Sequence, residues 1–202
     1  MFLQPPADNE AASRLFQSDL NQRGFVMNLS RAWAWRPDVW ESFLELRTLL
    51  TTHSSLSKGE LNVIVCAAAA SLGDSYCALA WGTMLAKLSD ASTAAAVLQA
   101  SECTALTARE QALAGWARKV VGNPNATTEG DVDELRAAGF SEREIFEATV
   151  FVAFRLAFAT INDALGISPD WQLAAAAPPE VRSAVTFGRS PSVESEVSQP
   201  RL

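Results

Sequence analysis

A single cysteine lies where a helix is predicted to begin, in the segment SLGDSYC at residues 71–77. Gly73 is typical of a helix end, and Asp74 is a suitable N-cap for the helix that follows, so Cys77 falls in its first turn. The free N–H groups of that turn favour a thiolate, the nucleophilic form of cysteine, whereas the nearby Asp74 carboxylate opposes it. Cys77 is therefore the candidate nucleophile. The alternative is a small side chain that packs at a helix start.

Few other residues could take part in thiol or metal chemistry. The three cysteines, Cys66, Cys77 and Cys103, are widely spaced and odd in number, which is not typical of a disulfide framework. Cys103 is predicted in a loop without a chemical role. The only histidine, His53, is predicted in a surface loop, with a site role in a neighbouring subunit as the alternative. Because no cysteine pair has zinc-site spacing, we expect no metal site.

The composition narrows the class of partner. The chain has 202 residues, about half of them apolar (49%), and a formal net charge of −7. Such a charge argues against binding to a phosphate backbone, and the sequence contains no basic run. The most apolar stretch, residues 148–161, is interrupted by Arg155 and is too short to span a bilayer. The first residues do not resemble a signal peptide. We therefore expect a cytoplasmic protein that binds neither nucleic acid nor membrane.

The elements that must position Cys77 all read as helices. Apolar residues recur with helical spacing, and no alternating strand pattern with hairpin turns is present. In the segment after Pro37, the stripe Val39, Phe43, Leu46 and Leu50 is predicted to face the core. Helices are expected over residues 9–23, 28–35, 36–50, 58–71, 74–88, 107–121, 127–139 and 141–166.

The last of these helices is apolar nearly all round, which predicts a central position in the fold. Two sequence signals mark the starts of long helices: Thr107 with Glu110, and Ser141 with Glu144, both of which have capping-box spacing. We expect one all-helical domain over residues 1–187 and a flexible, polar C-terminal tail over residues 188–202.

In the order of its motifs, the chain resembles the carboxymuconolactone decarboxylase superfamily, specifically its alkylhydroperoxidase D-like, peroxidase-related branch. The resemblance covers residues 24–170, and residues 106–149 are its most specific part. It implies an all-α helical bundle of about six to nine helices that assembles into homo-oligomers and needs no cofactor. The motifs that carry it are LSKGELNVIV, LGDSYC, LTAREQAL, PNATTEGDV, LRAAGFSEREI and INDALGISPDW.

The resemblance also assigns motif positions in this chain. Active members of the family carry a glutamate on one helix, and a Cys-x-x-Cys pair followed by a histidine on the next. The second cysteine attacks the peroxide, the first resolves its sulfenic acid, and the glutamate and histidine relay protons. Here these positions are Asn62, Asp74, Cys77 and Trp81. Cys66 shares a helix face with Asn62 and is the candidate second thiol, with an apolar packing role as the alternative.

Two functions follow from these residues. The first is a thiol peroxidase, an antioxidant oxidoreductase that uses Cys77 alone and an external thiol reductant. The second is a catalytically retired relative that binds a small ligand or a protein, because Asn62, Asp74 and Trp81 replace the reactive groups. Trp81 would then form the wall of an apolar pocket, since an indole has no basic atom. A dimer, trimer or hexamer is expected, with Trp33, Trp35 and Trp40 at an interface near the N-terminus.

Overall fold

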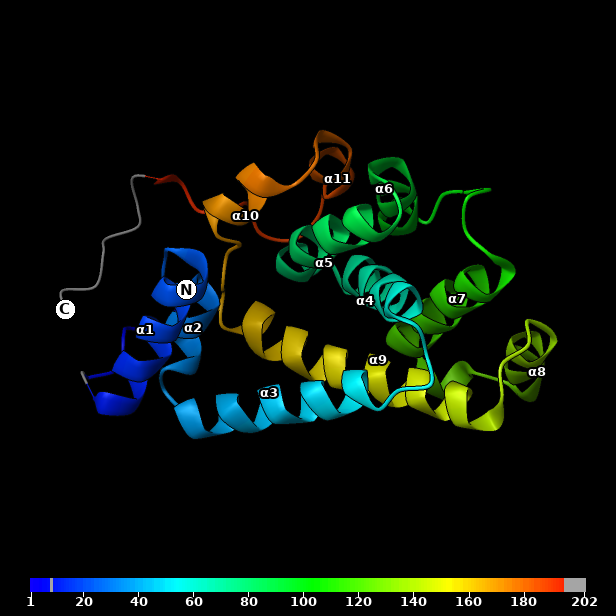
Figure 1. Cartoon of the computed structure of the whole chain (residues 1–202), viewed down its shortest axis with the longest axis horizontal. Helices are drawn as coiled ribbons and strands as arrows, with labels where there is room; N and C mark the ends of the chain where they lie inside the picture. The colour runs from blue at the N-terminus through cyan, green and yellow to red at the C-terminus, as the bar shows by residue number, and fades with distance from the viewer. Residues whose placement is uncertain (8, 195–202) are drawn as a thin grey trace.

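The computed structural model describes residues 1–7 and 9–194. Within these ranges the chain forms eleven α-helices, eight of them with seven or more residues, and no strand. This confirms the predicted all-α fold, although the short helices raise the number above the expected range. The helices are α1 (Glu10–Arg23), α2 (Asn28–Trp33), α3 (Pro37–Thr52), α4 (Lys58–Leu72), α5 (Ser75–Leu88), α6 (Ala91–Gln99), α7 (Ala108–Gly122), α8 (Glu129–Ala137), α9 (Glu142–Ala164), α10 (Trp171–Ala176) and α11 (Pro179–Ala184), with a 3₁₀ turn at Pro124–Ala126 (Figure 1).

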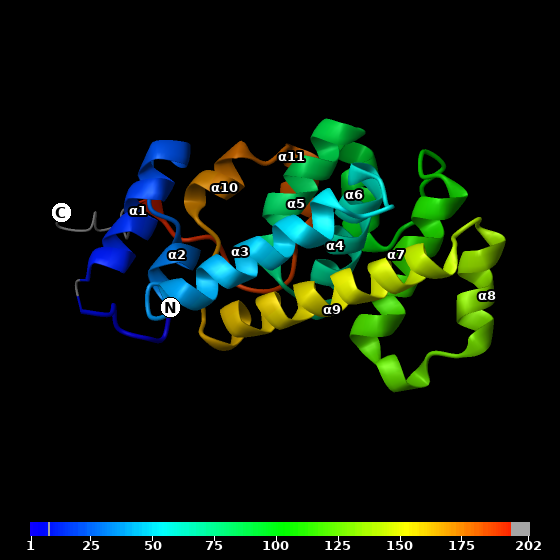
Figure 2. The same cartoon turned by 60° about the horizontal axis from the view of Figure 1, so that its bottom comes forward.

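Helix α4 is the centre of the bundle. Every residue from 60 to 69 is buried, because this segment is apolar on nearly all sides and can be covered all round. It packs against α5, α6, α7 and α9. Figure 1 shows α4 and α5 between α9 and the pair formed by α6 and α11. Figure 2 shows that α3 and α9 lie on the same side of the bundle. The helix that carries Cys77 therefore starts inside the molecule.

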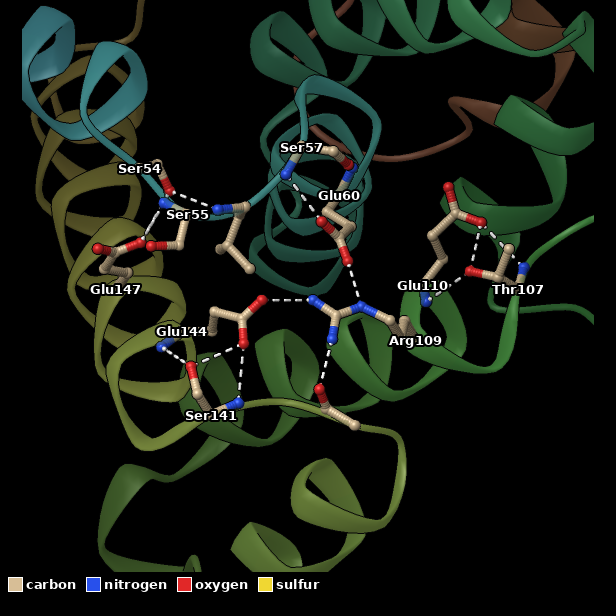
Figure 3. A network of polar contacts seen from close by, with 12 residues as sticks. Ser54, Ser55, Ser57, Glu60, Thr107, Arg109, Glu110, Ser141, Glu144 and Glu147 are labelled. Atoms are coloured by element: carbon tan, nitrogen blue, oxygen red, sulfur yellow. Dashed lines mark hydrogen bonds and ion pairs between the residues drawn. The ribbon is translucent and has the colours of Figure 1, made fainter.

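Polar contacts fix the start of α4 against α7 and α9 (Figure 3). Arg109 donates from Nε to Glu60 at 2.8 Å, from Nη2 to Glu144 at 2.7 Å and from Nη1 to the carbonyl oxygen of Gly139 at 2.7 Å. Glu60 and Glu144 are also the third residues of capping boxes, so each carboxylate holds a helix start and an arginine together. One guanidinium thus joins three helices.

The predicted helix starts are confirmed at both capping boxes named above, Thr107 with Glu110 and Ser141 with Glu144. The loop before α4 is tied to α9 as well, because Glu147 accepts hydrogen bonds from the Ser54 hydroxyl at 3.1 Å and the Ser55 N–H at 2.7 Å. The short helices α6, α10 and α11 were not expected.

Two predictions about buried faces are wrong in part. Leu46 is 43% exposed, and α3 has no fully buried residue, because it lies on the outside of the bundle. Val39, Phe43 and Leu50 do pack against the core. Helix α9 is buried on one side only, since Phe146 is 69% exposed. The apolar sequence of α9 correctly indicates that one side of the helix faces the core. It does not indicate whether other elements cover the opposite side.

Trp33 belongs to the core and not to a surface. It is 6% exposed, and its Nε1 donates to Asn162 Oδ1 at 2.9 Å. Its ring stacks on Phe158 with centroids 5.7 Å apart and contacts Trp40 at 5.4 Å. Trp33 was predicted at an interface, but in the structure it packs inside the chain and joins α2, α3 and α9.

The segment after α11 returns to the start of α5. Gly188 has φ +71°, and a Cβ at this position would collide with the carbonyl oxygen of Gly73, so the close approach requires glycine. The Ser75 hydroxyl donates to the carbonyl oxygen of Arg189 at 2.7 Å. Residues 195–202 of the predicted tail lie outside the described residues. None of the helices in the part that the structure describes combines the length and apolar character needed to cross a bilayer.

Candidate functional site

The junction between α4 and α5 places Cys77. Gly73 ends α4 with φ +80°, a left-handed conformation that favours glycine. Asp74 then caps α5, because its Oδ1 accepts the N–H of Cys77 at 2.9 Å. The predicted N-cap is confirmed, and Cys77 lies in the first turn with 4% of its surface exposed.

Cys77 lies between two groups of opposite charge. Arg155 of α9 donates from Nη2 to Cys77 Sγ at 2.9 Å. Arg155 is 5% exposed and Asp74 is fully buried. Among the described residues, neither Arg155 Nε nor Asp74 Oδ2 has a hydrogen-bond partner. A buried guanidinium and a buried carboxylate with unused hydrogen-bonding atoms are costly for the fold.

Burial is the main influence on the pKa of the Cys77 thiol and raises it well above its usual value. The positive charge of Arg155 lowers this pKa, and the negative charge of Asp74 raises it. The sulfur is therefore a protonated thiol at neutral pH, and Arg155 is the group that stabilises the thiolate when the proton leaves.

Cys77 and Arg155 line a cavity of about 210 Å³, here called the Cys77 cavity. Helices α1 and α3 form its outer walls, and α5 and α9 form its inner wall. Its apolar surface includes Met27, Trp40 and Trp81. Because a single water molecule needs only about 10–15 Å³ of such space, the Cys77 cavity has room for an organic molecule.

Aromatic faces support the buried charge on Arg155. Its guanidinium carbon lies 5.1 Å from the ring centroid of Trp81 and 5.0 Å from that of Phe158. Such cation–π contacts offset part of the cost of removing the guanidinium from water. Trp81 therefore forms a wall of the Cys77 cavity and also holds Arg155 beside the sulfur.

A second, much smaller cavity of about 10 Å³ lies on the other side of the sulfur, between α4, α5 and α9. Asp74, Cys77 and Arg155 line it together with apolar residues of α4. Its size suits one water molecule, and the unused atoms Asp74 Oδ2 and Arg155 Nε are polar groups that such a water could bind.

A hydrogen-bonded hub holds the residue before Cys77. The Tyr76 hydroxyl donates to Asp170 Oδ2, and the N–H of Asn28 donates to Asp170 Oδ1 at 2.8 Å. The Asn28 side chain continues to the carbonyl oxygen of Ser168 at 3.1 Å. These contacts join α5 to the start of α2 and to the segment after α9, so the direction of Cys77 is fixed from three elements.

The structure brings together three of the predicted site residues, Asp74, Cys77 and Trp81. It places Asn62 elsewhere on α4, where Nδ2 donates to the carbonyl oxygen of Lys58 at 2.7 Å. Cys66 is fully buried, and burial raises the pKa of its thiol to about 12. Within the described residues, Asn62 and Cys66 line neither cavity.

The two remaining candidates lie far from this site. His53 is the exposed C-cap of α3, and its carbonyl oxygen accepts from Arg143 at 3.5 Å. Cys103 is half-buried between α6 and α7, with its Sγ 3.8 Å from the Thr93 hydroxyl. The residue that the sequence interpretation missed is Arg155, a lone charge in an apolar run, which was read only as an interruption.

Asp163, at the end of α9, should make stability depend on pH. Burial, followed by the negative charge of Asp74, raises its pKa to about 7. In the unfolded chain an aspartate titrates near pH 4, so the folded state holds an extra proton between roughly pH 4 and 7. Stability is therefore expected to fall as pH rises through that window. The change Asp163→Asn should remove part of this fall, measured as the difference in Tm between pH 5 and pH 8.

A matched control for Asp163→Asn is Asp38→Asn. The hydrogen bond with Arg36 lowers the pKa of Asp38 to about 2, so this carboxyl is ionised at both pH values. Asp38→Asn should leave the difference in Tm between pH 5 and pH 8 unchanged. An equal difference in the wild type and in Asp163→Asn would contradict the assignment.

Comparison with known proteins identifies the fold. A crystal structure of the alkylhydroperoxidase AhpD core, an uncharacterized peroxidase-related protein from Ralstonia eutropha JMP134, is similar over 93% of this chain and 97% of that one (TM-score 0.68, 23% identity). An uncharacterized peroxidase-related protein from Silicibacter sp. TM1040 is similar over 85% and 93% (TM-score 0.74, 21% identity). No protein-family model and no curated protein sequence matches the chain.

A third similar structure is that of a protein named as a debrominase. It is a cysteine-to-alanine variant of the debrominase Bmp8 in complex with 2,3,4-tribromopyrrole, similar over 91% of this chain and 95% of that one (TM-score 0.69, 15% identity). These likenesses show that the chain has the helical fold of the alkylhydroperoxidase AhpD core. Because these neighbours include uncharacterized peroxidase-related proteins and a debrominase, the fold alone does not select a reaction.

Proposed function

We propose that this chain, with its alkylhydroperoxidase-type fold, reduces organic hydroperoxides through the single thiol of Cys77. The observation that carries the proposal is the 2.9 Å contact from Arg155 Nη2 to Cys77 Sγ in a cavity of about 210 Å³. A guanidinium beside a buried sulfur has little structural value and a clear chemical one, because it stabilises negative charge on that sulfur.

The oxidation step uses groups that line the cavity. The Cys77 thiol first loses its proton to solvent, and Arg155 holds the thiolate. The thiolate attacks the terminal oxygen of the hydroperoxide, so an S–O bond forms while the O–O bond breaks. The leaving alkoxide takes a proton from water and departs as an alcohol. The product on the protein is the sulfenic acid of Cys77.

The reduction step requires an external thiol. No second cysteine lines either cavity in the described part of the chain, and Cys66 is fully buried. Two equivalents of a small-molecule thiol return the sulfenic acid to the thiol, giving one disulfide of that reductant and one water. The cycle thus differs from a two-cysteine cycle, in which the resolving sulfur belongs to the same chain.

The proposal is tested with cumene hydroperoxide and dithiothreitol. The wild type should consume the hydroperoxide, and Cys77→Ser should reduce the rate to the background without protein. Dimedone should label Cys77 in peptide maps and leave Cys66 unlabelled. Because burial raises the pKa of Cys77, the rate should rise with pH by about tenfold per unit between pH 6 and pH 9.

Cys103→Ser is the control, because this thiol lies outside both cavities. It should retain the wild-type rate. Equal consumption by the wild type and Cys77→Ser, or labelling that does not depend on the hydroperoxide, would reject the peroxidase function.

A second candidate function is the binding of a small molecule without chemistry. It is favoured by the raised pKa of Cys77 and by the aromatic walls of the cavity, including Trp40 and Trp81. The same experiment separates the two functions. A binding protein would hold ligands in the Cys77 cavity in both the wild type and Cys77→Ser, and neither would consume hydroperoxide.

A further inference from the structure

The charges around the Cys77 cavity differ in sign from those of the whole chain. The chain has a formal net charge of −7. The lining of the cavity contains three arginines, Arg23, Arg47 and Arg155, and one aspartate, Asp19, which gives it a formal charge of +2. Three guanidiniums in one cavity of an acidic protein create a local positive potential that attracts anions.

The two outer arginines have unused hydrogen-bonding capacity. Arg23 ends α1 and Arg47 lies on α3, and both are exposed at the outer wall. Within residues 1–7 and 9–194, neither forms an ion pair. Asp19 already accepts a hydrogen bond at the cavity wall, from the N–H of Met27 to its Oδ2 at 3.0 Å. Although the Arg47 residue as a whole is exposed, partial loss of hydration at its guanidinium lowers its pKa. The charges of Arg155 and Arg23 lower this pKa further, so the three cations lie close enough to repel one another.

The inner arginine is already committed to the sulfur. Arg155 is 5% exposed and contacts Cys77 Sγ, so it does not reach the outer wall where Arg23 and Arg47 are exposed. The same cavity is also lined by apolar and aromatic side chains, including Trp40, Trp81 and Leu44. The cavity thus has a cationic outer end, an apolar middle and a reactive inner end.

We propose that the Cys77 cavity selects an organic molecule with a carboxylate at one end and an aromatic or branched apolar body, held with the carboxylate at Arg23 and Arg47. Arginine pairs suit carboxylates because each guanidinium offers two parallel N–H donors. This inference rests on the proposed function, which places the reducible O–O bond at the opposite end of the molecule, beside Cys77 and Arg155. The substrate class is a hydroperoxide that carries a carboxylate.

The test measures binding without thiol chemistry. Cys77→Ser protein is titrated with 4-isopropylbenzoate and with the neutral amide of the same shape, 4-isopropylbenzamide, by calorimetry or by tryptophan fluorescence. The carboxylate should bind at least about tenfold more tightly, because a charge-assisted contact to arginine contributes that much or more. In Cys77→Ser protein that also carries Arg23→Gln and Arg47→Gln, this preference should disappear while binding of the amide stays the same.

The control for the two arginine changes is Arg136→Gln in the same Cys77→Ser background, because Arg136 lies on α8 and pairs with Asp133 and Glu142. It should leave both affinities unchanged. Since Arg23 and Arg47 form no ion pair in the described residues and repel one another, their replacement should not lower Tm.

The proposed substrate class is overturned if the carboxylate and the amide bind equally, if neither binds, or if the preference survives the loss of both arginines. These outcomes are independent of the peroxidase function, because the protein tested lacks the thiol. If wild-type Cys77 is oxidised by cumene hydroperoxide but no preference for carboxylate is found, the function stands and the substrate class falls. If the preference is found but Cys77 is inert, the cavity is an anion-selective binding site.

Discussion

Replacing Arg109 with methionine is expected to lower the free energy of unfolding by about 2–3 kcal/mol. The guanidinium contacts Glu60 and Glu144 at 2.8 and 2.7 Å, and the side chains of these glutamates are only 11% and 16% exposed. Removing the cation leaves two carboxylates near each other with part of their hydration lost, which costs several kcal/mol when burial is complete and less here. Urea unfolding followed by far-UV circular dichroism measures the change.

The matched control for Arg109→Met is Arg136→Met. Arg136 also joins two carboxylates, Asp133 and Glu142, but their side chains are 63% and 74% exposed. Surface pairs contribute little, so Arg136→Met should lower the free energy of unfolding much less than Arg109→Met. If the two variants lose similar stability, burial is not what gives the Arg109 network its strength.

Replacing Arg155 with methionine is expected to raise the stability of the fold and to slow the oxidation of Cys77. The buried guanidinium donates to a neutral thiol, and its Nε has no partner in the described residues. An apolar side chain of similar length removes this desolvation cost, so unfolding should become more difficult by about 1–2 kcal/mol. The same change removes the charge that lowers the pKa of Cys77, and oxidation at pH 7 should slow by roughly 100-fold.

Arg155→Lys is the companion variant, because it retains the charge but loses the planar fork. It should recover part of the oxidation rate and none of the added stability. The two readouts are Tm and the rate of dimedone-detected sulfenic acid formation at Cys77. A purely structural Arg155 would give the opposite result, with stability lost and the pH dependence of Cys77 oxidation unchanged.

Local signals in the sequence were enough to predict most helix starts. The cap Asp74 and the two capping boxes depend on residues three positions apart, so the sequence contains both partners of each contact. Helix α6 was missed because its alanines, with one serine and one threonine among them, show no clear apolar stripe, although Asp90 caps it. Leu46 was placed wrongly because helical spacing shows which residues share a face and not what covers that face.

The candidate site was predicted only as far as its own helix. Asp74, Cys77 and Trp81 were found because they lie within one segment. The partner that defines the chemistry, Arg155, lies 78 residues after Cys77, and no local pattern links the two. A charge inside an apolar helix was the available signal, since such a charge requires a partner once it is buried. The outer arginines, Arg23 and Arg47, gave no signal of this kind because they are exposed.

The hub around Asp170 has a consequence for how the protein is made. A ribosome releases Tyr76 well before Asp170, which lies 94 residues later, and Ser75 before Arg189, which lies 114 residues later. Helix α5 is therefore synthesised without the groups that bury its start. The growing chain therefore carries Cys77 without its Arg155 partner until residues 78 positions later have been added. The surroundings of the Cys77 sulfur thus form only after α9 and the segment that follows it have been synthesised.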